Sequence, residues 1–467
     1  MSEHTGAGTR RMPLHTRILL GLGVGAVAGV ASNLLWSGAP ALDWAVDYVA
    51  QPVGQVFLRM LFMVVVPLIF TSLTLGVAGL GDIRRLGRVG GRTIGIFLAT
   101  TTLAVVIGLT ASNVIQPGAA IDPGVRAALL AEYGGAAAER SQLAEGGFGI
   151  QTFVNIVPRN PVDAAARGDM LGLIFFSLIF GVALTRVPKE AADSVLRVVD
   201  GIGQAVIVMI EFAMKLAPFG VAGLIFAVTA RFGFDVLQSL GLYVVAVLSA
   251  LALHQFGVIG LLVRWLTGVR PGLFFRKART LMVTTFSTSS SNATLPTTIR
   301  TAEEGFGVPR AVAGFVLPLG ATMNMNGTAL FEGMTILFLA QAFGLELSLA
   351  AQGIVVVMAV LTAIGTAGVP GGSIPLMAMV LVMVGIPAEG IALVLGVDRL
   401  LDMARTVPNV TADLLTSMVV ARHEGVWTAD MVPGDVPGDA APAANRLAPV
   451  PPTLPPMSPA PGAAATP

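Results

Sequence analysis

Charged and polar side chains interrupt one long apolar stretch late in the chain. Asp402, Arg405, Thr406, Asn409 and Asp413 follow spacings of three and four, which place them on one face of a helix. Charges are costly inside a membrane, so such a face usually lines a protein interior or a polar cavity. The pattern favours a pathway that binds a charged solute, and a buried network of structural ion pairs is the alternative.

The composition is that of a polytopic membrane protein. Of 467 residues, 54% are hydrophobic and only 12% are charged, whereas soluble domains contain roughly 25% charged residues. Without cysteine the chain can form neither disulfides nor thiolate metal sites. The net charge of +1 is uninformative about nucleic acid, but the sequence has no basic stripe with interleaved aromatics, so a nucleic-acid partner is not expected. With four histidines, and neither a nucleophile–base pair nor a phosphate-binding loop, an enzyme is not expected.

Apolar runs in the first part of the chain predict membrane-crossing helices. They cover about 15–36, 51–80, 90–115, 150–185, 200–230 and 236–266, and the fourth is interrupted by Pro158 and Pro161. The first run lacks a convincing cleavage site, so it is expected to span the membrane and not to be a signal peptide. Arginine and lysine gather before the first run and after the second, fourth and sixth, which predicts cytoplasmic termini.

Three polar breaks divide the C-terminal half, at residues 284–296, 324–328 and 363–373. The first and third have apolar arms and predict the tips of two re-entrant hairpins, because irregular backbone at membrane depth must be packed in protein or line a cavity. The second predicts a broken helix. Hairpin and helix alternate twice, which indicates an inverted repeat with its site near the midplane. Ordinary loops between shorter helices are the alternative.

Four motifs resemble, in order and spacing, those of the glutamate transporter family, the dicarboxylate/amino acid:cation symporters. They are SSSNATLP at 289–296, PLGATMNMNGT at 318–328, GTAGVPG at 365–371 and DMARTVPNVT at 402–411. The resemblance extends over roughly residues 12–425 and implies an all-α polytopic membrane protein of eight transmembrane helices plus two re-entrant hairpins, with inverted repeats. It also implies a prokaryotic secondary transporter in the cytoplasmic (inner) membrane, assembled as a homotrimer.

The resemblance further implies a scaffold and a transport domain that carries the substrate across the membrane like an elevator. The scaffold would comprise residues 15–89 and 117–230, the latter beginning with an extracellular loop, and the transport domain residues 90–116 and 231–424. Residues 1–14 would form a cytoplasmic N-terminal segment. The Pro/Ala-rich residues 425–467 would form a disordered tail.

An acidic amino acid offers two carboxylates and one ammonium, so its site needs a fixed cation, a fixed anion and neutral donors. The planar guanidinium of Arg405 suits the side-chain carboxylate, and Asp402, one turn away, suits the ammonium. By resemblance, the further substrate contacts are Ser290, Ser291, Thr328, Val369, Gly372, Thr406 and Asn409. Hydroxyls and backbone amides at the two hairpin tips would take the main-chain carboxylate. Alternatively, Arg405 is a neutralising partner of Asp402 alone.

Two other functions compete with the uptake of glutamate or aspartate. A C4-dicarboxylate such as succinate suits the same fold, but it has no ammonium, so Asp402 would repel it. A channel or sensor with a degenerate site would not need a complete amino-acid site. Some family members carry an arginine in the first hairpin where this chain has Ser289; Arg399 could supply that charge, or it could pair with Asp398.

The coupling ions implied by the resemblance are H⁺ and/or Na⁺, with no other cofactor or metal. One sodium site would comprise Gly320, Asn324, Asn409 and Asp413, a second Thr322 and Thr366, and a third Thr100, Thr101 and Asn326. The third site is doubtful, because Asn326 stands where the family has an acidic residue and Phe97 where it has tyrosine. A neutral amide binds a cation more weakly than a carboxylate does.

Glu332 is one of the few carboxylates embedded in a long apolar run. By resemblance, proton-coupled animal members of the family keep a glutamate here, whereas archaeal sodium-only members have glutamine. We therefore expect Glu332 to carry a proton; a glutamate at a water-lined surface is the alternative. With the anion missing at Asn326, this favours proton coupling with reduced or absent sodium dependence.

Overall fold

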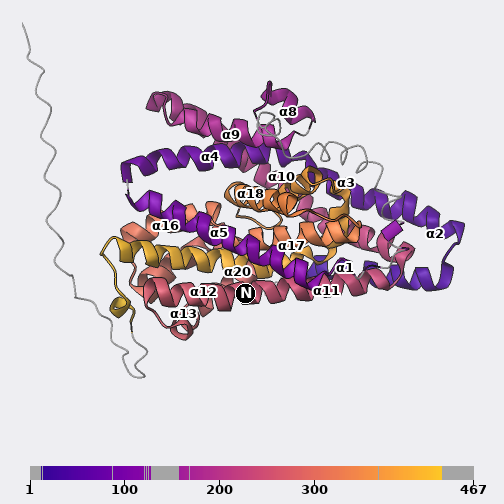
Figure 1. Ribbon diagram of the computed structural model, residues 1–467. Helices are drawn as coiled ribbons and strands as arrows, with labels where there is room; N and C mark the ends of the chain where they lie inside the picture. Colours follow the sequence, from indigo (N-terminus) through magenta and orange to yellow (C-terminus); the bar gives the residue numbers. More distant parts are fainter. Residues whose placement is uncertain are drawn as a thin grey trace, which may run out of the picture. The chain divides into compact units, whose positions relative to one another are not determined.

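The computed structural model describes residues 12, 14–86, 88–119, 121, 124, 126–127, 157–167, 169–366 and 368–433. Every regular element in these ranges is a helix, which confirms the all-α prediction (Figure 1). Most of the predicted N-terminal segment, most of the predicted extracellular loop and the tail beyond residue 433 lie outside the described residues.

In the first half of the chain the helices follow the apolar runs. They are α1 (Leu14–Trp36), α2 (Pro40–Ala45), α3 (Gln51–Met63), α4 (Val65–Leu86), α5 (Arg88–Ile115), α8 (Pro161–Arg167), α9 (Met170–Leu184) and α10 (Lys189–Phe232). In the fourth run, Pro158 lies in non-helical chain and Pro161 begins α8. A second interruption precedes α9, where the carboxylate of Asp169 accepts the amide of Gly172 (3.1 Å) and caps the helix.

Except for α20, the second half of the chain contains shorter helices, and the three predicted polar breaks fall at the junctions of α14 with α15, α16 with α17, and α18 with α19. The helices are α11 (Asp235–Ala252), α12 (Ile259–Leu262), α13 (Pro271–Lys277), α14 (Arg279–Thr288), α15 (Ser291–Arg300), α16 (Arg310–Met323), α17 (Asn326–Ala342), α18 (Leu349–Gly365), α19 (Ile374–Met383) and α20 (Ala392–His423). The pair α14 and α15 is called the first hairpin, and the pair α18 and α19 the second. Helices α16 and α17 flank the break at Asn324 and Met325.

Several helices have the length and composition of membrane spans. Five stretches of the described chain qualify, namely Thr16–Trp36, Pro40–Ala78, Val89–Ile115, Lys189–Phe232 and Leu237–Thr267. They coincide with the first, second, third, fifth and sixth predicted spans. Helix α9 and both helices of the second hairpin are apolar but shorter. These features identify a membrane-embedded protein.

Glycines allow α1 to approach α10 closely. Gly21, Gly25 and Gly29 repeat every four residues and face the backbone or side chains of α10. A Cβ atom on Gly25 would lie 2.5 Å from the carbonyl oxygen of Ala222. Small residues at such spacing let helices pack in a membrane, where burial of apolar surface drives little association.

Helix α17 lies at the centre of the helical unit, between α5 and α20 (Figure 1). All its residues except Gln341 are buried. Helix α20 is also buried over most of its length. The charged and polar side chains that the sequence places on these two helices therefore lie inside packed protein.

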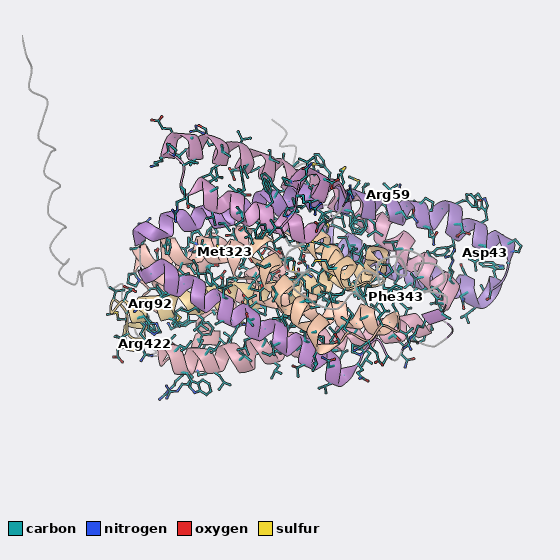
Figure 2. The ribbon with its side chains drawn as sticks, turned by 45° about the horizontal axis from the view of Figure 1, so that its top comes forward. Asp43, Arg59, Arg92, Met323, Phe343 and Arg422 are labelled. Atoms are coloured by element: carbon teal, nitrogen blue, oxygen red, sulfur yellow. The ribbon has the colours of Figure 1, made fainter. Side chains whose placement is uncertain are left out.

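The start of α5 and the end of α20 lie at the same end of the unit. Figure 2 shows Arg92 and Arg422 there and Asp43 at the opposite end. Arg92 joins the two helices by an ion pair with Glu424 (2.7 Å). The basic region before α5 and the chain after α20, both predicted to be cytoplasmic, are thus on one side.

The chain remains packed for some residues after α20. Trp427 is fully buried, and its indole nitrogen donates to the carbonyl of Phe306 (2.7 Å). Val432 is buried in the same apolar cluster. The expected start of the disordered tail at residue 425 is therefore wrong for residues 425–433, because large apolar side chains persist up to Val432.

We expect Gly25→Ala to lower the melting temperature of the purified protein in detergent. The added methyl group would collide with α10, and such overpacking typically costs about 1–3 kcal/mol. Gly23→Ala in the same helix is the control, because no atom lies within 4 Å of its Cβ position. Equal melting temperatures for the two variants would contradict this packing.

Candidate functional site

The tips of the two hairpins are bonded to each other. Ser289 has a left-handed backbone (φ 51°) and ends α14, and the Ser290 hydroxyl accepts the amide of Ala293 (3.1 Å) and caps α15. The Ser290 hydroxyl donates in turn to the carbonyl of Gly368 (2.6 Å), in the second hairpin. The amide of Asn292 donates to the same carbonyl (3.2 Å). One backbone carbonyl of the second tip therefore holds the first tip in place.

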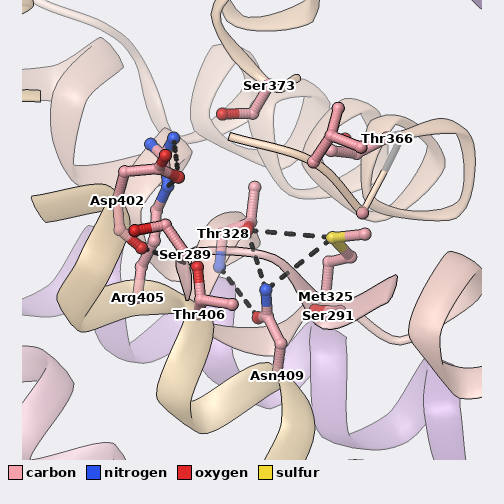
Figure 3. A pocket seen from close by; sticks show the side chains of 12 residues that line it. Ser289, Ser291, Met325, Thr328, Thr366, Ser373, Asp402, Arg405, Thr406 and Asn409 are labelled. Carbon is pink, nitrogen blue, oxygen red and sulfur yellow. Dashed lines mark hydrogen bonds and ion pairs between the residues drawn. The ribbon is translucent and has the colours of Figure 1, made fainter. Parts of the chain in front are cut away.

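A small cavity lies beneath the joined tips (Figure 3). Its lining comes from both tips, the break before α17, and α20. The lining residues are Ser289, Ser291, Met325, Thr328, Thr366, Gly368, Val369, Ser373, Asp402, Arg405, Thr406 and Asn409. Elements up to 120 positions apart along the chain thus meet at one site, as the four motifs predict.

Most of the predicted substrate contacts line this cavity, but two do not. The hydroxyl of Ser290 is used at the tip, and the amide of Gly372 donates to the carbonyl of Val369 (3.1 Å). Ser289, Met325, Gly368 and Ser373 line the cavity and were not predicted as site residues. Each lies inside a motif or polar break already recognised, so the polarity of the breaks was the available signal.

Arg405 is buried between two carboxylates and an aromatic ring. Its Nη2 and Nε donate to Asp402 Oδ1 (2.8 and 3.1 Å), and its Nη1 lies 3.2 Å from Asp398 Oδ1. The guanidinium stacks over the ring of Phe331, 4.2 Å from its centroid. Arg405 therefore has more than the single partner that the neutralising alternative assumed.

Asp402 also forms an ion pair with the guanidinium of Arg399. Arg399 Nη1 lies 3.3 Å from Asp402 Oδ2, and the amide of Gly371 donates to the same oxygen (3.2 Å). Arg399 thus pairs with Asp402, and Asp398 pairs with Arg405, so the alternative of an Arg399–Asp398 pair is wrong. That Arg399 supplies the charge missing from the first hairpin stays a prediction. The formal charges of these two aspartates and two arginines cancel.

Asn409 forms hydrogen bonds with the first residues of α17, after the break at Asn324 and Met325. Its Oδ1 accepts the amides of Gly327 (2.7 Å) and Thr328 (3.2 Å), and its Nδ2 donates to the Thr328 hydroxyl (3.1 Å). A Cβ on Gly327 would overlap the backbone of Arg405, so only glycine lets α17 approach α20 this closely. Asn409 therefore caps α17 in the way that an N-cap residue does.

Three of the four residues predicted for the first sodium site lie together, whereas Asn409 bonds the start of α17. Asn324 Nδ2 donates to Asp413 Oδ1 (2.9 Å), and the Asp413 carboxylate lies against Gly320, where a Cβ would be 2.6 Å from its Cγ. The two residues predicted for the second site differ in burial. Thr322 is exposed and its hydroxyl donates to its own helix at Leu319, whereas Thr366 is buried.

The third predicted cation site is assembled from neutral groups. Thr101 donates to Asn326 Oδ1 (2.8 Å), and Thr100 lies 3.4 Å from Asn324 Oδ1. Asn326 is fully buried, and its Nδ2 finds no acceptor among the described residues. Phe97, at the position where the family has tyrosine, is also buried. The described chain also contains no group of three or more His, Asp or Glu side chains suited to a metal ion.

Glu332 is fully buried on α17, next to Phe331. The Thr362 hydroxyl of the second hairpin donates to its Oε2 (2.7 Å). No donor among the described residues reaches its Oε1. Glu332 therefore does not lie at a water-lined surface in this conformation, contrary to the alternative raised from the sequence.

Comparison with known proteins gives concordant matches over almost the whole chain. The model of the sodium:dicarboxylate symporter family matches residues 14–423. A proton/sodium-glutamate symport protein of Bacillus caldotenax is 34% identical over 419 residues, 90% of this chain and 96% of the relative. The proton/glutamate-aspartate symporter of Escherichia coli is 34% identical over 414 residues, 89% and 93% of the two chains. A C4-dicarboxylate transport protein of Rhodospirillum rubrum is 34% identical over 403 residues, 85% and 87%.

The contact between the hairpin tips can be tested by cross-linking, because the chain has no native cysteine. A Cβ on Gly368 would lie 2.9 Å from Cγ of Asn292, so cysteines at these two positions are close enough for a disulfide. We expect Asn292→Cys/Gly368→Cys to cross-link on mild oxidation, as detected by mass spectrometry of linked peptides. The pair Asn292→Cys/Gly314→Cys is the control, because no atom lies near the Gly314 Cβ position. Failure of the first pair to link would show that the tips do not meet.

Proposed function

This chain belongs to the sodium:dicarboxylate symporter family, a family of transporters and not of enzymes, and we propose that it takes up acidic amino acids with protons and/or sodium. The substrate would be glutamate or aspartate. The observation that carries the proposal is that one buried cation, Arg405, and one buried anion, Asp402, face the same cavity. Two of the relatives described above are named as glutamate or glutamate-aspartate symporters.

Substrate binding would replace the ion pair between Arg405 and Asp402 with two ion pairs to the substrate. The fork of Arg405 would turn from Asp402 to the substrate side-chain carboxylate, and Asp402 would take the ammonium. Because each buried charge keeps an opposite partner, the exchange avoids the cost of an unpaired charge in a site of low dielectric. Asp398 and Phe331 would keep the guanidinium in place during the exchange.

Serine hydroxyls from both hairpins are available for the main-chain carboxylate. Ser289 and Ser373 line the cavity, and their buried hydroxyls have no partner among the described residues. Ser291 lines it as well. A carboxylate that accepts hydrogen bonds from both tips would hold them together, so occupation of the site would favour closed hairpins.

A C4-dicarboxylate remains a second candidate substrate, and a specific contact favours it. The ion pair between Arg399 and Asp402 weakens the repulsion that Asp402 would otherwise exert on a second carboxylate. The Rhodospirillum rubrum relative is named as a C4-dicarboxylate transport protein. Competition of unlabelled succinate against labelled glutamate and aspartate would decide between the two classes.

Proton coupling would involve Glu332. A charged carboxylate with one unpartnered oxygen is unfavourable in a buried site, whereas a protonated one is tolerated. The neutral Asn326, Thr100 and Thr101 cluster offers a poor site for a further cation. Sodium, if used, would bind near Asp413, Asn324 and Gly320.

For the architecture we propose eight transmembrane helices and two re-entrant hairpins with inverted repeats, in a homotrimer in the inner membrane with cytoplasmic termini. Residues 15–89 and 117–230 would form the scaffold, and residues 90–116 and 231–424 the moving transport domain. The packing of α5, α17 and α20 around the site supports this division, as does the separate glycine-mediated packing of α1 with α10.

Arg405→Cys should abolish uptake of glutamate and aspartate into proteoliposomes. Loss of one partner from a buried ion pair typically costs about 3–5 kcal/mol, a factor of roughly one hundred or more. Without the guanidinium that would take a side-chain carboxylate, the site should admit neutral amino acids instead. Arg197→Cys, at an exposed position of α10, is the control. Unchanged glutamate uptake by the Arg405 variant would refute the substrate assignment.

Glu332→Gln should remove uptake driven by an imposed proton gradient, because an amide cannot carry the proton. Exchange of labelled for unlabelled substrate at equal pH should persist, since it needs no net proton movement. Both are measured in proteoliposomes, with proton and sodium gradients imposed separately. Robust uptake by the native protein from sodium alone, with no response to pH, would rule out proton coupling.

A further inference from the structure

Tyr243 on α11 is a fully buried polar side chain that lines no part of the cavity. It lies among the buried apolar residues Leu240, Ala246 and Val247. A phenol hydroxyl inside a membrane-embedded bundle needs a hydrogen-bond partner, because water is not there to supply one. The position of that partner shows what the residue can do.

The hydroxyl of Tyr243 forms a hydrogen bond with α17, and the contacts of its partner identify the donor. It lies 2.6 Å from the hydroxyl of Thr335, which itself donates to the carbonyl of Phe331 (2.7 Å). Because the single hydrogen of Thr335 is used on that carbonyl, Tyr243 is the donor. The ring of Tyr243 also stacks on Phe338, with centroids 4.3 Å apart. Tyr243 therefore contacts two successive turns of α17, at Thr335 and at Phe338.

The turn that Tyr243 reaches supports the buried charges. The ring of Phe331 lies under the Arg405 guanidinium, 4.2 Å from centroid to Cζ. The next residue, Glu332, accepts the hydroxyl of Thr362. A rotation or shift of α17 at Phe331 would therefore displace the surface on which Arg405 rests.

We propose that Tyr243 is a positioning residue for substrate recognition. Through Thr335 and the Phe331 carbonyl it fixes the turn of α17 that supports the Arg405 guanidinium. This inference rests on the proposed function, in which Arg405 binds the substrate carboxylate. It assigns to α11 a role in substrate affinity, although Tyr243 does not touch the cavity.

The decisive variant is Tyr243→Phe, which removes one oxygen atom and keeps the ring on Phe338. In proteoliposomes, the KM for labelled glutamate and aspartate should rise roughly three- to tenfold, the effect of losing one net hydrogen bond. The maximal rate should change less than about twofold, because bound substrate would still be carried across. Tyr48→Phe is the matched control, since Tyr48 is exposed and its ring stacks on Trp44.

Variants of Thr335 distinguish loss of the hydrogen bonds from Tyr243 to the Phe331 carbonyl from a nonspecific loss of packing around α17. Thr335→Val keeps the shape and removes the hydroxyl, so it should raise KM as much as Tyr243→Phe does. The double variant should be no worse than either single one, because both remove the same chain. Thr335→Ser restores the hydroxyl and should return KM to near the native value.

Three results would overturn the proposal: a native KM in Tyr243→Phe, additive effects in the double variant, or an equal rise in Tyr48→Phe. The parent function is tested separately. If Arg405→Cys retains glutamate uptake, the substrate assignment itself fails. If Arg405→Cys abolishes uptake while Tyr243→Phe keeps the native KM, only the positioning role fails.

Discussion

The permanent positive charge of Arg405 is almost completely removed from water, with its side chain 1% exposed. Such a charge is stable only where opposite charges and hydrogen bonds replace its hydration. Asp398 and Asp402 on the same helix supply the negative charges, and Phe331 on α17 supplies the face of an aromatic ring. The close approach of α17, permitted by Gly327, is therefore part of the electrostatic arrangement and not only of the packing.

The breaks between helices create a similar requirement, because buried backbone groups also need polar partners. Each break exposes amides and carbonyls that lipid cannot satisfy. Ser290 caps α15, Asn409 caps α17, and the carbonyl of Gly368 accepts two bonds from the first hairpin. The groups that satisfy the broken backbone are thus neighbours of the groups that line the cavity. A ligand that moves one hairpin tip must also disturb the hydrogen bonds that hold the other.

Much of this arrangement could be predicted from the sequence, because helical periodicity is local. Spacing alone places Asp402, Arg405 and Asp413 on one face of a helix, and the polarity of the breaks locates the hairpin tips. Periodicity cannot choose between neighbouring partners, so it offered Asp398 as a partner of Arg399, whereas the structure pairs Arg399 with Asp402.

Other details depended on single torsion angles or on distant contacts. The left-handed backbone of Ser289 turns that residue into the cavity lining and leaves Ser290 to cap a helix. Thr322, predicted as a cation ligand, is directed outward by its position on α16. The order of residues 425–433 rests on a contact with Phe306 that no local pattern encodes.

That contact has a consequence for the synthesis of the protein. Trp427 and Phe306 are 121 positions apart, so Phe306 is made long before the indole that bonds its carbonyl. Until then the Phe306 carbonyl and the surrounding apolar side chains have no cover from this segment. A nascent chain that ends short of Trp427 therefore presents exposed apolar surface of the kind that chaperones and proteases detect.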